Sequence, residues 1–226
     1  MPVKSANCVN TFKMTDKTNL LLVGGGGHCR SVIESIERSG LFHIIGISDR
    51  AEEAGKLISG YTINTTDEDA GKLEFENLHC IITVGQIKSA QPRKKLFDLM
   101  KSFGFKMATL IDPSAIVSER CEIGEGTVVL RDCFINAGVT IGRNCIINSK
   151  AMVEHDSYVG DNVHVSTGAI INGDCHIGND CFIGSGAVIA NAVSIASGSI
   201  IGAGAVILGN INTPGTYLGN PGRRIF

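Results

Sequence analysis

The sequence predicts a small α/β domain with a short parallel sheet, followed by a parallel β-helix. Three observations support this fold class. Strand-like and helix-like segments alternate between residues 20 and 108, and an aliphatic residue recurs every six positions from residue 111 onward. The 226-residue chain also contains 28 glycines and no tryptophan. Many tight corners and few large rings are typical of a coiled, repetitive architecture.

In the first part of the chain, NLLLVGGGGH is a short apolar strand that runs into glycines. CRSVIESIERSG carries Val32, Ile33 and Ile36 at helical spacing. HIIGISD and LHCIITVG are predicted strands, and QPRKKLFDLMKSFG is a second predicted helix. Strands that alternate with helices favour a parallel sheet. The predicted organisation is a disordered tail over 1–17, an α/β domain over 18–108, and a β-helix with its C-terminal tail over 109–226.

The second part is periodic. Counting by six from Ile111 meets isoleucine or valine at all seventeen positions up to Ile207. No straight strand or helix has this period, but each hexad of a parallel β-helix forms one side of a coil and turns a corner. Three hexads per coil would place residue n beneath residue n + 18, one strand spacing of about 4.8 Å away. One hexad position holds five cysteines, which we predict to be small buried hydrophobic residues and not metal ligands: Cys121, Cys133, Cys145, Cys175 and Cys181.

Composition excludes several classes of function. The formal net charge is −2, so no overall basic excess points to nucleic acid or to an anionic membrane. No apolar run is long enough to cross a bilayer. The N-terminal residues lack the apolar stretch of a secretory signal, so we expect a cytoplasmic protein with reduced cysteines.

One polar segment interrupts the aliphatic pattern. VEHDSYVGDNVHVSTGAIING places Glu154, His155 and Asp156 side by side. A carboxylate bonded to an imidazole fixes its tautomer and raises its basicity, as a general base requires, and either acid could supply it. The residue one coil above His155 is Gly173, which would leave a backbone N–H and open space for an acyl group. The alternative is that His155 and His164 are solvated residues of a repeat.

A glycine loop precedes the first predicted helix. VGGGGHCRS, residues 23–31, follows a strand, and backbone N–H groups at a helix start can bind phosphate. The loop matches a dinucleotide fingerprint only in part, because Cys29 stands at the third glycine position. It also lacks the Lys-Ser/Thr pair of a P-loop. A simple strand-to-helix turn is therefore the alternative.

The hexads and the segment NSKAMVEHDSYVGDNVHVSTGAIINGDCHIG resemble the hexapeptide-repeat sugar acyltransferases, of the bacillosamine-pathway UDP-amino-sugar N-acetyltransferase and sialic acid O-acetyltransferase type. The resemblance implies a left-handed β-helix and a homotrimer with sites between subunits. It makes His155 the general base and Asp156 the acid that tunes it. The residues that it implies for acetyl-CoA binding are His164, Gly173, Ser185, Ala203 and Arg223.

The glycine loop also resembles the G-x-x-G-H loop of that family, which binds the nucleotide part of a UDP-sugar in the N-acetyltransferase branch. The substrate-binding residues implied in this way are Gly26, Gly27, His28, Asp49, Gly85 and Asn148. The expected activity is acetyl-CoA-dependent N-acetylation of a UDP-linked amino-deoxy sugar for bacterial glycan synthesis, without a metal. The Gly173 N–H, with His164 as a second donor, is expected to stabilise the oxyanion. O-acetylation of sialic acid or a related sugar acid, and a non-catalytic β-helix scaffold, are the alternatives.

Overall fold

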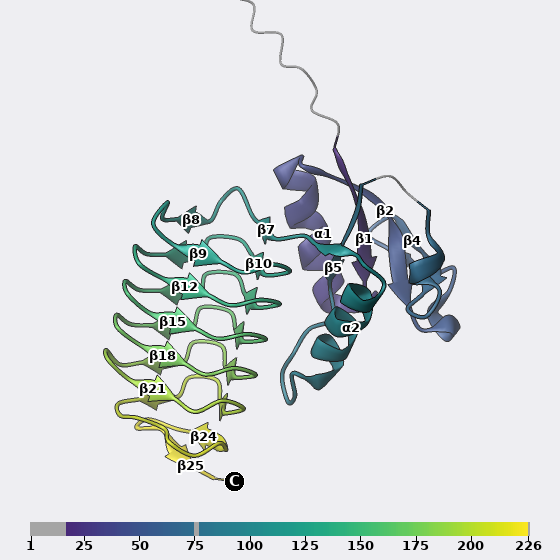
Figure 1. The fold of residues 1–226 in the computed structure, drawn as a ribbon. Helices are drawn as coiled ribbons and strands as arrows, with labels where there is room; N and C mark the ends of the chain where they lie inside the picture. The colour runs from purple at the N-terminus through teal and green to yellow at the C-terminus, as the bar shows by residue number, and fades with distance from the viewer. Residues whose placement is uncertain (1–16, 75–76, 226) are drawn as a thin grey trace, which may run out of the picture.

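The computed structural model describes residues 17–74 and 77–225 and contains two domains that lie side by side (Figure 1). Apart from Lys17, the predicted tail lies outside the described residues, and so does Cys8. No helix in the described ranges combines the length and the apolar character that a membrane crossing needs.

The N-terminal domain is built on a six-stranded sheet with the order β3-β4-β2-β1-β5-β6. All neighbouring strands are parallel except β3 and β4. The strands are β1 (Thr18–Val23), β2 (Phe42–Asp49), β3 (Leu57–Ile58), β4 (Tyr61–Thr66), β5 (Leu78–Ile82) and β6 (Lys106–Met107). The helices are α1 (Gly27–Ser39) and α2 (Gln91–Ser102), with short 3-10 turns at Ala51–Glu53 and Ala70–Lys72. The predicted α/β unit is confirmed.

The two helices cover opposite faces of this sheet because side chains alternate along β1. Leu20 and Leu22 pack with α1, in a buried cluster that also includes Leu110 and Ile146 of the β-helix. Leu21 packs toward α2 on the other face. The α1 side of the domain therefore shares its apolar core with the second domain, which holds the two together.

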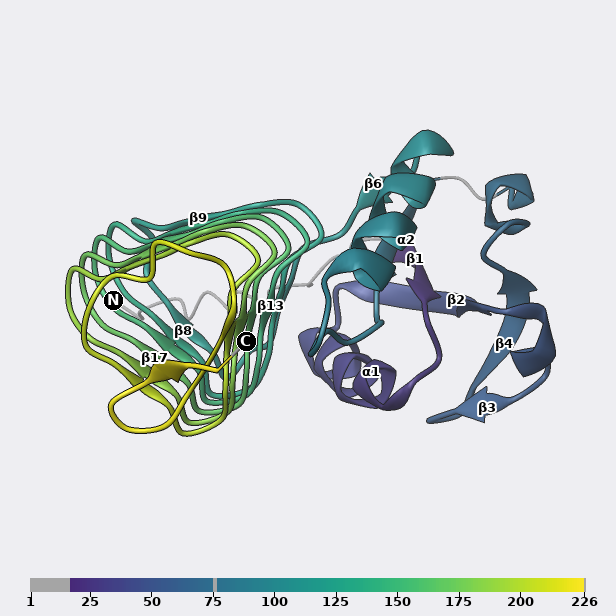
Figure 2. The same cartoon turned by 90° about the horizontal axis from the view of Figure 1, so that it is seen from below.

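The second domain is a triangular prism with three walls of two-residue parallel strands (Figure 2). The domain-facing wall packs against the N-terminal domain and contains β7 (Leu110–Ile111), β10 (Val128–Val129), β13 (Ile146–Ile147), β16 (His164–Val165), β19 (Phe182–Ile183) and β22 (Ile200–Ile201). The apolar wall contains β8 (Ile116–Val117), β11 (Phe134–Ile135), β14 (Met152–Val153), β17 (Ile170–Ile171), β20 (Val188–Ile189) and β23 (Val206–Ile207). The polar wall contains β9 (Glu122–Ile123), β12 (Thr140–Ile141), β15 (Tyr158–Val159), β18 (His176–Ile177) and β21 (Ser194–Ile195).

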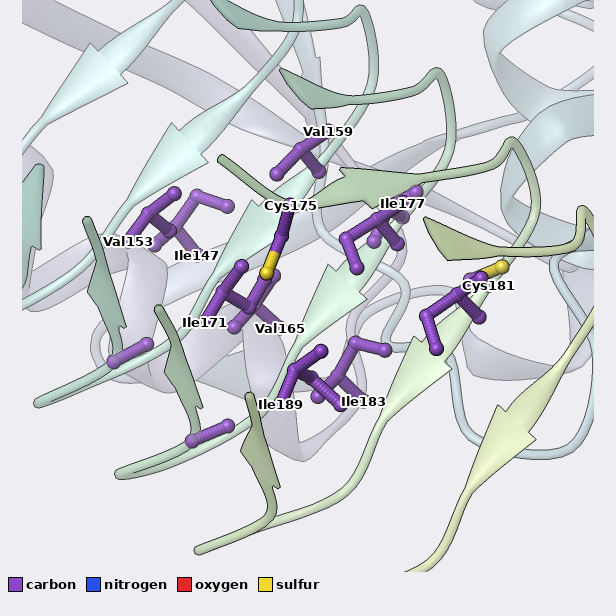
Figure 3. Close-up of a cluster of buried hydrophobic side chains, with 14 of the residues drawn as sticks. Ile147, Val153, Val159, Val165, Ile171, Cys175, Ile177, Cys181, Ile183 and Ile189 are labelled. Atoms are coloured by element: carbon purple, nitrogen blue, oxygen red, sulfur yellow. The ribbon is translucent and has the colours of Figure 1, made fainter. Parts of the chain in front are cut away.

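The register of these walls confirms the predicted 18-residue coil. Val129 pairs with Ile147, and Ile147 pairs with Val165. The second residue of each strand points inward and stacks on its equivalents in the neighbouring coils, as Figure 3 shows for part of the core. Ile111 is 39% exposed because no coil precedes it.

The burial of the five hexad cysteines largely follows the prediction. Four of the five are buried and Cys121 is half-buried. Burial raises the pKa of the Cys133 and Cys145 thiols to about 12, so both stay protonated and unreactive.

Two edges of the prism matter for the site. The Asn148 edge joins the domain-facing wall to the apolar wall and includes residues 148–151, 184–187 and 202–205. The His155 edge joins the apolar wall to the polar wall and includes residues 136–139, 154–157 and 172–175. Many corners need a left-handed residue, and Asn or Asp tolerates that conformation best after glycine. Asp156 is one of these, with φ of 59°.

The chain ends on the last coil with a short hairpin, in which β24 (Thr216–Leu218) joins the domain-facing wall and pairs with β25 (Arg223–Arg224).

Candidate functional site

His155 and Asp156 form a pair at the His155 edge. Nδ1 of His155 lies 2.9 Å from Oδ2 of Asp156, so the carboxylate accepts the Nδ1 proton and leaves Nε2 free. The left-handed backbone at Asp156 turns its side chain back toward the ring. This hydrogen bond is the main cause that raises the pKa of His155, and Glu154 and Asp174 add to it. The ring is exposed, so Nε2 can accept a proton from a bound molecule.

Glu154, the other acid considered, has a different partner. Its carboxylate accepts a 2.5 Å hydrogen bond from Nδ2 of Asn136, one coil below. Neighbouring residues on a strand point apart, but His155 and Asp156 occupy a turn, so the alternation does not separate them. The geometry therefore pairs His155 with Asp156.

Gly173 lies directly above the imidazole. A Cβ built on Gly173 would stand 2.6 Å from Nε2 of His155. The Gly173 N–H donates to no acceptor within the described residues. The free nitrogen of the ring thus lies against the Gly173 backbone, whose N–H group has no acceptor within the described residues.

Gly173→Ala should lower kcat by about tenfold or more, because the new methyl group forces the ring away from its position. The ring is exposed and can move, so the melting temperature should change little. Gly209→Ala is the matched control: Gly209 occupies the equivalent corner two coils further on, and nothing lies within 4 Å of its Cβ position. Steady-state kinetics and thermal unfolding check this, and equal activity in both variants would contradict it.

His164 lies elsewhere, on the domain-facing wall. Its Nδ1 lies 2.5 Å from the backbone oxygen of Gln86, and its Nε2 lies 3.1 Å from Nδ2 of Asn148. The ring therefore donates through Nδ1 and accepts through Nε2. Burial is the main cause that lowers its pKa, to about 4, so the ring is neutral. With both nitrogens engaged, this geometry does not favour the expected role of His164 as an oxyanion donor.

The glycine loop has the geometry of an anion site. Gly24 has φ of 107°, and a Cβ there would lie 2.4 Å from Val84, so only glycine fits. Gly26 and Gly27 begin α1 with open space around them. Their N–H groups, in the first turn of a 13-residue helix, can meet a phosphate together with the helix dipole.

This loop opens into a cavity of about 560 Å³ between the two domains. That volume is in the range of small-molecule sites. Five of the predicted substrate residues line it, and His164 forms part of its floor: Gly26, Gly27, His28, Asp49 and Gly85. Burial lowers the pKa of His28 to about 3, so this ring is neutral too. Asn148 reaches this region through its contact with His164.

Asp49 supports the loop as well as lining the cavity. Its Oδ2 accepts from the Gly25 N–H at 2.6 Å, and its Oδ1 accepts from the Arg50 N–H at 2.7 Å. Each oxygen retains a lone pair for a ligand.

Sequence reasoning missed Asp67, which follows β4 and accepts a short hydrogen bond from the Ser48 hydroxyl. Burial, with the nearby charge of Asp49, raises the pKa of Asp67. An acid after a weak strand gave no signal in the sequence.

The other predicted acetyl-CoA residues are spread over the prism. Ser185 and Ala203 lie on the Asn148 edge, not on the edge that holds His155 and Gly173. Arg223 lies in the terminal hairpin and is exposed. Within one chain, the predicted site residues thus fall into two separate groups. One is the glycine-loop cavity with His164 and Asn148, and the other is the His155–Asp156 pair with Gly173. The described residues contain no cluster of three or more potential metal ligands.

A hexad-built prism with a carboxylate-paired histidine on one edge, beside an α/β domain with a glycine loop, is typical of acyltransferases of the hexapeptide-repeat class. The family model for the PglD N-terminal domain matches residues 19–115. The model for the bacterial transferase hexapeptide matches residues 138–173 and 174–209. A comparison with curated proteins found no match.

Solved structures match nearly the whole chain. The acetyltransferase domain of PglB from Neisseria gonorrhoeae FA1090, in complex with acetyl coenzyme A, is 30% identical with a TM-score of 0.86, over 92% of this chain and 100% of that one. PerB from Caulobacter crescentus, in complex with CoA and GDP-perosamine, is 30% identical with a TM-score of 0.85, over 92% and 97%. WeeI from Acinetobacter baumannii AYE, at 22% identity and a TM-score of 0.75, shares the fold.

The chain belongs to the hexapeptide-repeat sugar acyltransferases that carry a PglD-type N-terminal domain, and its class of enzyme is acyltransferase. The predicted family and the predicted fold, an α/β domain followed by a left-handed parallel β-helix, are both confirmed.

Proposed function

We propose that this protein transfers the acetyl group of acetyl-CoA to the amine of a UDP-linked amino-deoxy sugar, for bacterial glycan synthesis. The observation that carries the proposal is the pairing of His155 with Asp156, which leaves Nε2 free beneath Gly173. The glycine-loop cavity supplies the second requirement, a place for a nucleotide diphosphate. Relatives that bind acetyl coenzyme A, or CoA with GDP-perosamine, support both parts. A cytoplasmic location stays a prediction.

In the proposed mechanism, Nε2 of His155 takes the proton from the sugar amine as its nitrogen attacks the thioester carbonyl. The Gly173 N–H donates to the developing oxyanion, an interaction worth roughly 3 kcal/mol in other enzymes. The C–S bond then breaks, and the imidazolium returns its proton to the departing CoA sulfur. Asp156 keeps the ring in the required tautomer throughout.

The two groups of site residues lie on different sides of the prism, so we propose that a homotrimer completes the site. The outward residues of the apolar wall form a continuous apolar stripe that is exposed at Ile116 and half-buried at the other positions, and such a stripe favours contact with another copy. Its residues are Ile116, Phe134, Met152, Ile170, Val188 and Val206. Three prisms with this wall toward a common axis bring the His155 edge of one copy against the Asn148 edge of the next. His155 would then face Asn148, Ser185 and Ala203 of its neighbour.

The substrate is tested with acetyl-CoA and a panel of UDP-linked and GDP-linked amino-sugars and free sialic acid, by following release of the CoA thiol. Turnover confined to UDP-amino-sugars is expected. Preference for a GDP-sugar would correct the nucleotide, and turnover of sialic acid alone would favour O-acetylation. A chain that binds no CoA in calorimetry would refute the proposed acetyl transfer.

The acid limb of the kcat/KM profile should reflect His155, because only the neutral ring can accept a proton. The Asp156 hydrogen bond raises the pKa of His155, so activity is lost as the pH falls through a value above that of an ordinary histidine. Asp156→Asn removes this cause, so the limb should move to lower pH while kcat falls by about tenfold or more. Glu154→Gln, which removes a carboxylate that does not bond the ring, should shift the limb less. Equal shifts would rule out the assigned pairing.

A further inference from the structure

Arg93, in the first turn of α2, is a fully buried cation. Its side chain is the largest among the fully buried ones, and no carboxylate within the described residues pairs with it. All its hydrogen bonds go to backbone carbonyls. Nη1 donates to Ile82 at 2.6 Å and to Val84 at 3.0 Å, Nε donates to Asn144 at 3.0 Å, and Nη2 donates to Gly126 at 3.4 Å.

These four carbonyls belong to both domains. Ile82 ends β5, and Val84 lies in the segment 83–90 that leads from β5 to α2. Gly126 and Asn144 lie at corners of the β-helix. The guanidinium is planar and presents its donors in a rigid fork, so it sets the direction of each bond as well as its length. Arg93 therefore holds the 83–90 segment in one position relative to the prism.

The same segment is attached at a second point. Nε2 of Gln86 donates to the carbonyls of Asn162 at 2.9 Å and Cys181 at 3.2 Å. The Gln86 carbonyl accepts from Nδ1 of His164. Val84, Gly85 and Gln86 form one side of the glycine-loop cavity. The position of this side is thus set from the prism, through Arg93 and Gln86.

Burial alone does not explain an arginine here. An apolar side chain of similar size often stabilises a protein interior as well as a buried charge does, and the charge must be desolvated. What an apolar residue lacks is directional contact with carbonyls of two domains. The positive charge of Arg93 also acts on His28 and His164, the two histidines of the cavity. Burial is the main cause that lowers the pKa of each ring, and the Arg93 charge is a further cause. A neutral His164 keeps Nε2 as the acceptor for Asn148.

We propose that Arg93 is a positioning residue for the nucleotide sugar, which sets the 83–90 side of the cavity against the β-helix through its four backbone carbonyl contacts. The proposal rests on the proposed function. A positioning role differs measurably from a purely structural one, because substitution of Arg93 should weaken binding of the nucleotide sugar and leave binding of acetyl-CoA nearly unchanged. The segment lines the glycine-loop cavity, and none of its described residues forms a hydrogen bond with His155, Asp156 or Gly173.

The test uses the full chain and compares Arg93→Met and Arg93→Lys with wild type. Arg93→Met should raise the KM of the nucleotide sugar, and the Kd of UDP in calorimetry, about tenfold or more, with the KM of acetyl-CoA within about twofold. Arg93→Lys keeps the charge without the fork, so it should recover only part of the affinity. Lys94→Met is the matched control. The side chain of this next residue on α2 also reaches the prism, through a 3.6 Å ion pair with Asp180, and only its backbone N–H, which the substitution keeps, bonds the 83–90 segment, at the Ala90 carbonyl.

Three results would overturn the inference. They are a nucleotide-sugar KM unchanged in both Arg93 variants, an equal rise in both KM values, and an equal effect of Lys94→Met. If Arg93→Met does not fold, Arg93→Lys decides: full wild-type affinity for UDP would exclude the role of the fork. A wild-type protein that binds neither UDP nor GDP and transfers no acetyl group would instead refute the proposed function.

Discussion

His155→Ala should keep its fold and lose acetyl transfer by a factor of about 10²–10⁴, the usual contribution of a general base. The side chain is exposed at a corner and contributes nothing to the aliphatic core, so its removal should leave the coil intact. Its Nε2 is nevertheless the free basic nitrogen, and it lies against the backbone of Gly173 in the coil above. The loss should appear in kcat, measured by thiol release, with an unchanged melting temperature.

His176→Ala is the control for this variant. His176 is another exposed histidine of the same prism, where it stacks on Tyr158 with ring centroids 4.6 Å apart. Its replacement should leave kcat within about twofold of wild type, as surface substitutions usually do. Near wild-type activity in a folded His155→Ala protein would contradict the mechanism. An equal loss of activity in both variants would mean that the substitutions disturb the β-helix, and it would also contradict the assigned role of His155.

The second large effect is complementation between two inactive variants. Gly27→Asp should abolish nucleotide binding, because Gly27 has open space for the side chain but the new carboxylate would repel a phosphate at the start of α1. His155→Ala lacks the base. Trimers refolded from an equal mixture should recover about a quarter of the wild-type activity. Each site takes its loop from one chain and its histidine from the next, and with random assembly each of these is intact in about half of the sites.

Differently tagged chains show whether mixed trimers form. The control mixes His155→Ala with a chain that carries both His155→Ala and Gly27→Asp, in which no site can regain its base. Mixed trimers without recovered activity would show that the loop and the histidine act within one chain. A monomeric protein in solution would contradict the proposed assembly directly.

The hexads predicted the β-helix domain almost completely. A period of six with aliphatic side chains in every repeat has one efficient arrangement, in which each residue stacks on its equivalent 18 positions later. The same register predicts Gly173 above His155, where the structure places it. The short strands β3, β4 and β6 were missed, because weak segments of two to six residues take their conformation from the sheet that they join.

The site was predicted less completely, because the sequence does not fix the direction in which each side chain points or its hydrogen-bond partners. The residues alone left both Glu154 and Asp156 open as the acid that bonds His155, and the resemblance favoured Asp156. The structure pairs His155 with Asp156, at a left-handed turn. The spacing of one and a half hexads predicted that His164 lies on a neighbouring face or corner, and only the structure shows that its ring bonds Gln86 beside the glycine-loop cavity. No local pattern reveals the contacts of Asp67 and Arg93. Asp67 bonds Ser48, 19 residues away, and Arg93 bonds Gly126 and Asn144, 33 and 51 residues away.

The sequence by itself determined the two domains, the coil and the presence of an imidazole with an acid and a glycine at one corner, because these follow from periods and from stacking between equivalent positions. Only the tertiary structure decided how the domains face each other, and therefore which residues share a cavity. That choice depends on the common core of α1 and the prism and on hydrogen bonds such as those of Arg93, which join carbonyls far apart in the chain.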